Sequence, residues 1–121
     1  LEGRVVGRHP ARLVLAVGGV GYELTVPAGA AFPAEGETAR VHTHLVVRED
    51  AHLLYGFPSR SARQLFRLFL RVQKVGPALA LALVSGLAPD ELLAALRAKD
   101  APRLARIKGV GKKTAERLLL E

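Results

Sequence analysis

The chain has 121 residues, enough for one or two small domains, and half of them are apolar, which predicts a packed core. It contains no cysteine, so disulfides and thiolate metal sites are excluded and a reducing, cytoplasmic location is expected. No long apolar run and no charged stub with an apolar core are present, so we expect neither a membrane-spanning helix nor a signal peptide.

The formal net charge of +7 is distributed unevenly along the chain. Residues 1–57 carry five basic and six acidic side chains, whereas residues 58–121 carry thirteen basic and five acidic ones, a net of +8. This asymmetry predicts a polyanionic partner. Nucleic acid is favoured over a membrane surface, because no basic stretch has a bulky aromatic face. A solvated, arginine-rich surface is the alternative.

The first half has the alternating pattern of short strands. These strands are expected at residues 4–7, 12–17, 21–26, 40–47 and 51–57, with a loop at 27–36. In the fourth strand, Val41, Thr43, Leu45 and Val47 should share one face. Five short strands predict a small Greek-key barrel of the OB type, with an SH3-like barrel as the alternative.

Beyond Pro58 the apolar spacing becomes helical. Helices are expected after a cap at Ser59 or Ser61, from Pro77 to Gly86, from Pro89 to Ala98, after Asp100, and after Gly111 to the end of the chain. The predicted fold class is therefore α+β with segregated halves. An OB-type barrel at 1–58 precedes an all-helical domain at 59–121.

The helical half contains an internal repeat at an offset of 35 residues. It pairs Val75 with Val110, Gly76 with Gly111, Ala80 with Ala115 and Leu83 with Leu118. Each copy predicts a helix, a tight turn containing glycine, and a second helix. Two copies indicate a paired motif and not a solenoid.

The turn of the second copy suits a phosphate ligand. The glycines of Gly109-Val110-Gly111 permit positive φ, and amides beside a helix N-terminus offer donors to an anion. Lys112 and Lys113 add two cations, and Val110 is expected to point into the core. Such a turn binds sugar-phosphate backbone without reading bases.

The segment from Lys108 to Glu116 resembles the helix-hairpin-helix motif of DNA-repair proteins. The resemblance implies that DNA backbone is bound by Lys108, Gly109, Val110, Gly111, Lys112, Lys113 and Thr114, and in the first copy by Lys74, Val75 and Gly76. The first copy departs from the pattern, with Lys74 in place of the first glycine and Ala78 in place of a basic residue. A nucleotide-binding P-loop is excluded, since Arg106 stands where the first glycine of that motif is required.

Three segments taken in order, residues 17–23, 43–57 and 109–121, resemble the RuvA family of bacterial Holliday-junction-binding subunits. The resemblance implies a fourfold tetramer, or two tetramers face to face, on four-way junction DNA. It further implies partnership with the hexameric ATPase RuvB and the resolvase RuvC in recombination and repair. The family's motor-binding third domain lies beyond Glu121, so we expect this chain to bind junctions without recruiting RuvB.

The resemblance also gives a role to Glu49 and Asp50, between the last two strands. In the family an acidic turn at this place projects to the junction centre. Two carboxylates there would repel phosphates, disfavour uninterrupted duplex and guide strands apart.

We expect no catalytic residue, metal site or cofactor. Glu49 and Asp50 are poor co-ligands on one tip, and His42 and His44 share a strand face without an evident third ligand. One rival is a hairpin-motif lyase, glycosylase or nuclease that uses Lys112 or Lys113. Another is a duplex or single-strand binder, whose bases would have to stack on the barrel aromatics, Tyr22, Phe32, Tyr55 and Phe57.

Several other basic residues have no single predicted role. Arg48 would pair with the acidic tip or contact a phosphate. A basic face of the first helix (Arg60, Arg63, Arg67 and Arg71) would face DNA or a neighbouring subunit. The cluster Arg97, Lys99, Arg103 and Arg106 would extend a phosphate track or be solvated.

Overall fold

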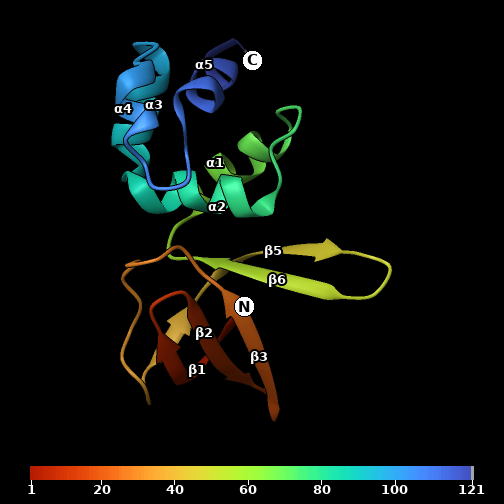
Figure 1. Ribbon diagram of the computed structural model, residues 1–121. Helices are drawn as coiled ribbons and strands as arrows, with labels where there is room; N and C mark the ends of the chain where they lie inside the picture. The colour runs from red at the N-terminus through yellow and green to blue at the C-terminus, as the bar shows by residue number, and fades with distance from the viewer. Residues whose placement is uncertain (121) are drawn as a thin grey trace. The chain divides into compact units, whose positions relative to one another are not determined.

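The computed structural model describes residues 1–120 and divides into two compact units, Leu1–Arg63 and Gln64–Glu121 (Figure 1). The first unit holds six strands: β1 (Glu2–His9), β2 (Arg12–Val17), β3 (Val20–Thr25), β4 (Thr38–Arg40), β5 (His42–Val47) and β6 (His52–Phe57). The helices are α1 (Arg60–Leu70), α2 (Pro77–Gly86), α3 (Pro89–Arg97), α4 (Ala101–Ala105) and α5 (Lys112–Leu120). The predicted segregation of strands and helices is confirmed.

The strands form one curled, OB-like sheet in the order β4-β1-β2-β3-β6-β5. All neighbouring strands are antiparallel except β3 and β6, which are parallel and pair at Thr25 and Tyr55. A bulge between Val5 and Gly7 bends β1, as the curvature of such a sheet requires.

The expected fourth strand, residues 40–47, is wrong as a single element. The chain changes partners at Val41, so that β4 pairs with β1 while β5 pairs with β6. Val41 itself exchanges backbone hydrogen bonds with Leu1, donating to its carbonyl over 2.7 Å and accepting from its nitrogen over 2.8 Å. One extended run therefore supplies both edges of the sheet, and the sheet has six strands where five were expected.

Apolar residues from every strand except β5 form one hydrophobic core enclosed by the curled sheet. This core consists of Val5, Leu13, Leu15, Leu24, Val26, Phe32, Ala39 and Val41, with Val17, Tyr22, Ala30 and Leu54 packed against it. Gly56 is closely packed against this core, because a Cβ there would lie 2.8 Å from Val41 Cγ1 and 3.1 Å from Leu24 Cδ2.

The helices begin where the sequence predicts caps. Ser59 Oγ accepts a hydrogen bond from Ala62 N at the start of α1, which selects Ser59 over Ser61. Asp100 Oδ1 likewise accepts from Arg103 N at the start of α4. Prolines occupy the first turns of α2, α3 and α4, where a missing N–H costs no helical hydrogen bond.

In the second unit, α3 packs against α2 and α4, and α4 packs against α5. Figure 1 shows α4 beside α3. A salt bridge of 3.0 Å between Arg103 and Glu91 connects α4 to α3. Within residues 1–120, no single helix is long and apolar enough to cross a membrane, although α2 and α3, bent by 102° at their junction, pass that test as a pair.

Candidate nucleic-acid interface

The second hairpin joins α4 to α5. Val110 donates its backbone N–H to Ile107 O over 2.9 Å, which closes a tight turn. Gly109 has φ +90°, a left-handed conformation that favours glycine. Val110 is 4% exposed, so the expectation that its side chain points into the core is confirmed.

The first hairpin, between α1 and α2, has the same backbone design 35 residues earlier. Val75 donates its N–H to Val72 O over 3.1 Å, and its side chain is 7% exposed. Lys74 takes the place of Gly109 and has φ +68°. The repeat seen in the sequence is therefore a repeat of structure, and the departure at Lys74 does not alter the turn.

Each hairpin ends at a helix N-terminus. The first bond within α5 runs from Ala115 N to Gly111 O (2.9 Å), and the first within α2 runs from Ala80 N to Gly76 O (3.0 Å). Amides ahead of those bonds have no partner inside their helix and are suited to an anion. The first hairpin offers one amide fewer, because Pro77 lacks an N–H.

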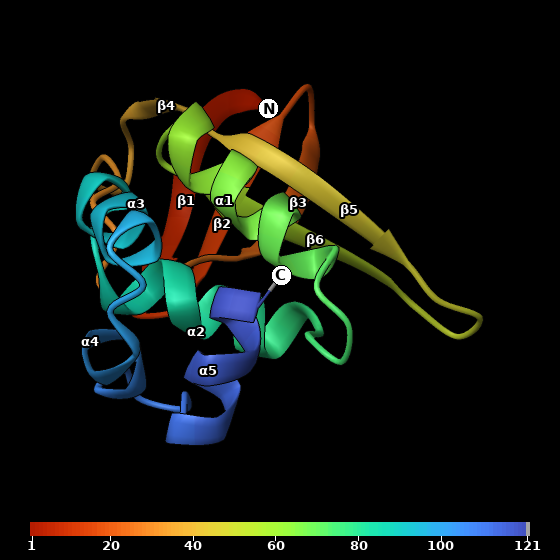
Figure 2. The same cartoon turned by 90° about the horizontal axis from the view of Figure 1, so that it is seen from above.

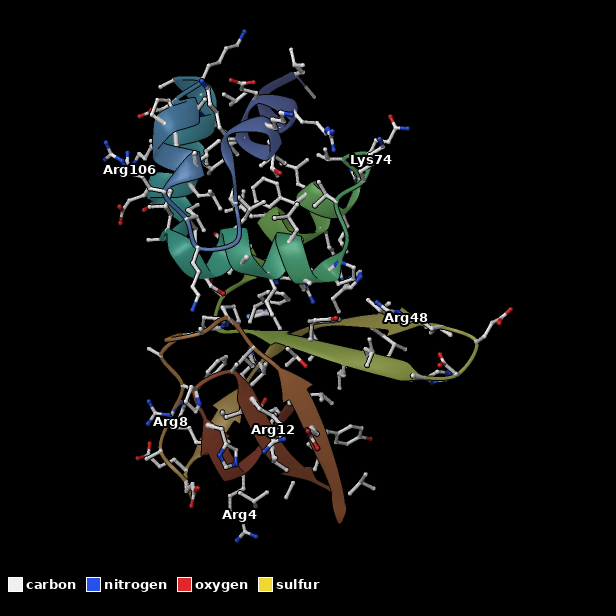
Figure 3. All side chains as sticks on the ribbon, in the orientation of Figure 1. Arg4, Arg8, Arg12, Arg48, Lys74 and Arg106 are labelled. Atoms are coloured by element: carbon white, nitrogen blue, oxygen red, sulfur yellow. The ribbon has the colours of Figure 1, made fainter. Side chains whose placement is uncertain are left out.

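The second unit is strongly basic, with eleven lysines and arginines against five acids. Around the second hairpin the expected site residues Lys108, Gly109, Gly111, Lys112 and Lys113 are all exposed, and Thr114 is half-exposed. Figure 3 shows the labelled Lys74 and Arg106 side chains extending outward. Arg103 is engaged by Glu91, so it is less available to a phosphate than Arg106.

The two expected acidic residues lie at the end of a long β-hairpin. Strands β5 and β6 pair from His42 and Phe57 out to Val47 and His52, and Arg48 N donates to Ala51 O over 2.8 Å at the turn. Glu49 and Asp50 are both exposed there. Figure 2 shows this hairpin extending beyond the other strands of the sheet, so the two carboxylates are well placed to meet an external partner.

The projection also exposes apolar side chains that the alternating pattern did not distinguish. On the face that begins with Val41, which is 1% exposed, Leu45 is 53% exposed and Val47 is 62% exposed. The alternating pattern in the sequence does not show that this hairpin extends beyond the rest of the sheet (Figure 2).

The barrel aromatics do not form a surface for stacking bases. Phe32, Tyr55 and Phe57 are buried, and Tyr22 packs against the barrel core. Binding of single-stranded DNA by base stacking needs exposed aromatic rings. Each of these four rings is either buried or packed against the barrel core, so they do not support that alternative.

His42 lies in a positively charged part of the first unit. Burial lowers the pKa of its imidazole below 6.5, and the charges of Arg63, Arg60, the amino terminus and Arg40 lower it further. Arg63 donates to Thr43 O over 3.3 Å, which places its guanidinium near β5. Among residues 1–120 no group of three or more His, Asp or Glu side chains is placed to hold a metal ion.

Comparison with known proteins covers both units. Residues 1–56 match the RuvA N-terminal domain, and residues 66–121 match the SAM-like helix-hairpin-helix tandem. Proteins named Holliday junction branch migration complex subunit RuvA from Pseudomonas putida W619 and Pseudomonas savastanoi pv. phaseolicola are 56% and 58% identical over the whole chain. The chain is therefore similar to RuvA proteins in both of its units. It spans 60% and 61% of the length of these two relatives.

These matches confirm the resemblance expected from the three sequence segments. They also assign both hairpins to a helix-hairpin-helix tandem, since the matched residues 66–121 include Lys74 as well as Gly109. The matched RuvA N-terminal domain includes the whole β5–β6 hairpin and its acidic tip.

Proposed function

We propose that this chain binds four-way (Holliday) DNA junctions in a manner that depends on structure and not on sequence, and holds them open for branch migration. The observation that carries the proposal is the pair of equivalent hairpins in a strongly basic unit, each with a buried valine and an exposed helix N-terminus. Phosphate contacts of this kind carry no sequence information, as a moving junction requires.

The helical residues 59–121 are assigned to the DNA backbone. In the second hairpin, amides from Gly111 to Thr114 would bind phosphate oxygens, and the ammonium groups of Lys108, Lys112 and Lys113 would neutralise them. Gly109 allows close approach, while Val110 anchors the turn. In the first hairpin, Lys74, Val75 and Gly76 would take the corresponding parts.

The barrel, residues 1–58, is assigned to the junction centre. Glu49 and Asp50 project from it and would repel the phosphates of a duplex that runs straight across the site. At 6 Å in a water-like dielectric, one carboxylate–phosphate pair costs about 0.7 kcal/mol. The tip would therefore lower affinity for all DNA while raising the preference for an open crossover.

The relatives are named as subunits of a branch migration complex, which supports an assembled state. We propose a homotetramer, alone or as two face to face, because fourfold symmetry would give each junction arm the same set of hairpins. The hexameric ATPase RuvB and the resolvase RuvC are the proposed protein partners, in the bacterial cytoplasm. The chain itself is proposed to be a non-catalytic subunit, with ATP hydrolysis left to RuvB.

The test is a binding titration at several salt concentrations, with an immobile four-way junction and a linear duplex of the same sequence. We expect a junction preference that persists as salt rises, because the geometric part of recognition is not screened. Equal affinities that fall together would leave a general DNA-binding module. Cleavage of either substrate, lost in Lys113→Ala, would favour the enzyme alternative.

A further inference from the structure

The first hairpin carries a lysine where its structural equivalent is a left-handed glycine. Lys74 has φ +68°, and Gly109, 35 residues later, has φ +90°. Within residues 1–120, Lys74 and Lys99 are the two non-glycine residues with positive φ. An L-residue with a Cβ is strained in this conformation, whereas glycine adopts it freely.

Nothing within the described chain compensates for this strain. The Lys74 side chain is exposed, and it forms no hydrogen bond or ion pair with residues 1–120. A lysine that serves only the fold would be expected to gain a contact in return. Its ammonium group is instead free to meet an external anion.

The cations of the two hairpins lie at different places. Helix α5 begins with Lys112 and Lys113, but the equivalent residues at the start of α2 are Pro77 and Ala78. Between residues 72 and 79 the sole lysine or arginine is Lys74. The first hairpin has thus lost both helix-start cations and one amide, and it has gained one cation in the turn.

We propose that Lys74 replaces the missing helix-start cations and supplies the phosphate contact of the first hairpin, at a cost in stability. This inference rests on the proposed function. The turn position is suitable because it lies two residues from the Gly76 amide, and the flexible lysine stem lets the ammonium reach a phosphate held there. The hairpins are then equivalent in function although their charges are not at equivalent positions.

The experiment compares Lys74→Gly with wild type in thermal unfolding and in junction binding over a range of salt. Relief of strain should raise Tm by about 3–6 °C, after allowance for the greater freedom of glycine in the unfolded chain. Loss of the phosphate contact should weaken junction binding by roughly three- to tenfold and reduce the log–log salt slope by about 0.9.

Two further variants isolate the cause. Lys74→Gly combined with Ala78→Lys restores a cation at the helix start, so it should keep the higher Tm and regain wild-type affinity and salt slope. Lys99→Gly removes the same charge and the same kind of strain at the C-terminal end of α3, outside both hairpins. It should raise Tm by a comparable amount, which measures the contribution of the strain alone.

Unchanged affinity and salt slope in Lys74→Gly would overturn the inference. A lower Tm in Lys74→Gly would overturn the claim that stability is sacrificed. The proposed function is judged separately, by the preference of the wild-type chain for a junction over a duplex. Junction and duplex both contain phosphates. If the wild-type chain shows no preference for the junction, the comparison of Lys74→Gly with wild type on duplex DNA still tests the role of Lys74.

Discussion

The backbone of Gly86, at the C-terminal end of α2, lies directly against the side chain of Ile107 in the second hairpin. A Cβ at Gly86 would lie 2.8 Å from Ile107 Cγ1 and 3.1 Å from its Cβ, and it would overlap Cγ2. Ile107 is buried and its carbonyl accepts the bond that closes the Val110 turn. Because Gly86 has no side chain, the backbone of α2 can pack directly against Ile107 of the second hairpin.

Gly86→Ala should destabilise the helical unit by about 1–3 kcal/mol, because the added methyl group forces a buried side chain to move. Urea unfolding measures the change. Ile107→Ala, which removes both γ carbons, should cost about 2–5 kcal/mol alone. Combined with Gly86→Ala it should cost clearly less than the two single changes added together. Strict additivity would show that the contact carries no energy.

His42 predicts a pH dependence of stability. Its pKa is lowered in the folded chain, so near pH 6.5 and below, the unfolded state binds a proton that the folded state resists. The free energy of unfolding should therefore be fully maintained above pH 6.5 and should fall as the pH drops through 6.5. Urea titrations between pH 5.5 and 7.5 measure this trend.

In those titrations His42→Gln should remove the part of the slope that His42 causes. His52→Gln is the matched control, because it makes the same substitution at an exposed position near the end of the same hairpin. Identical slopes in wild type and His42→Gln would contradict the prediction.

Local signals in the sequence predicted most of the elements. The helix starts at Ser59, Pro77 and Asp100 follow from capping chemistry, which needs only neighbouring residues. The partner change at Val41 does not, because it depends on a backbone pairing with Leu1, forty residues away. The sequence therefore predicted an extended run at this place but not its division between two edges of the sheet.

In the candidate site, too, the sequence predicted the features that depend on neighbouring residues but not those that depend on the folded conformation. The hairpins were predicted because their glycines and valines recur at a fixed offset. The left-handed conformation of Lys74 was not predicted, since a lysine in a glycine position gives no sign of whether the turn changes or the residue is strained. The lowered pKa of His42 depends first on the burial of its imidazole and then on the charges of Arg63 and Arg60 of α1, and strand periodicity predicts neither.

Lys112→Ala and Lys113→Ala should each weaken binding to junction and duplex alike. Each lost phosphate contact should reduce the log–log salt slope by about 0.9. Fluorescence titrations from low to high salt measure the slope. Arg117→Ala removes an exposed charge from the last turn of the same helix and should leave the slope near its wild-type value. Equal effects of all three variants would indicate general electrostatic attraction instead of defined contacts.

Glu49 and Asp50 should act by repelling phosphates. Reversing their charge should therefore raise the affinity for linear duplex DNA more than the affinity for the junction. Glu49→Lys with Asp50→Lys should tighten duplex binding roughly five- to thirtyfold, as removal of about 1–2 kcal/mol of repulsion predicts, and should reduce the junction-to-duplex affinity ratio. Glu35→Lys with Glu37→Lys makes the same charge change at exposed positions in the loop before β4. This control should leave the ratio unchanged, because a general gain of positive charge raises both affinities together. Paired titrations of junction and duplex at one salt concentration measure the ratio. A ratio that is unchanged by the tip substitutions, or lowered equally by the loop substitutions, would exclude a specific repulsive role for Glu49 and Asp50.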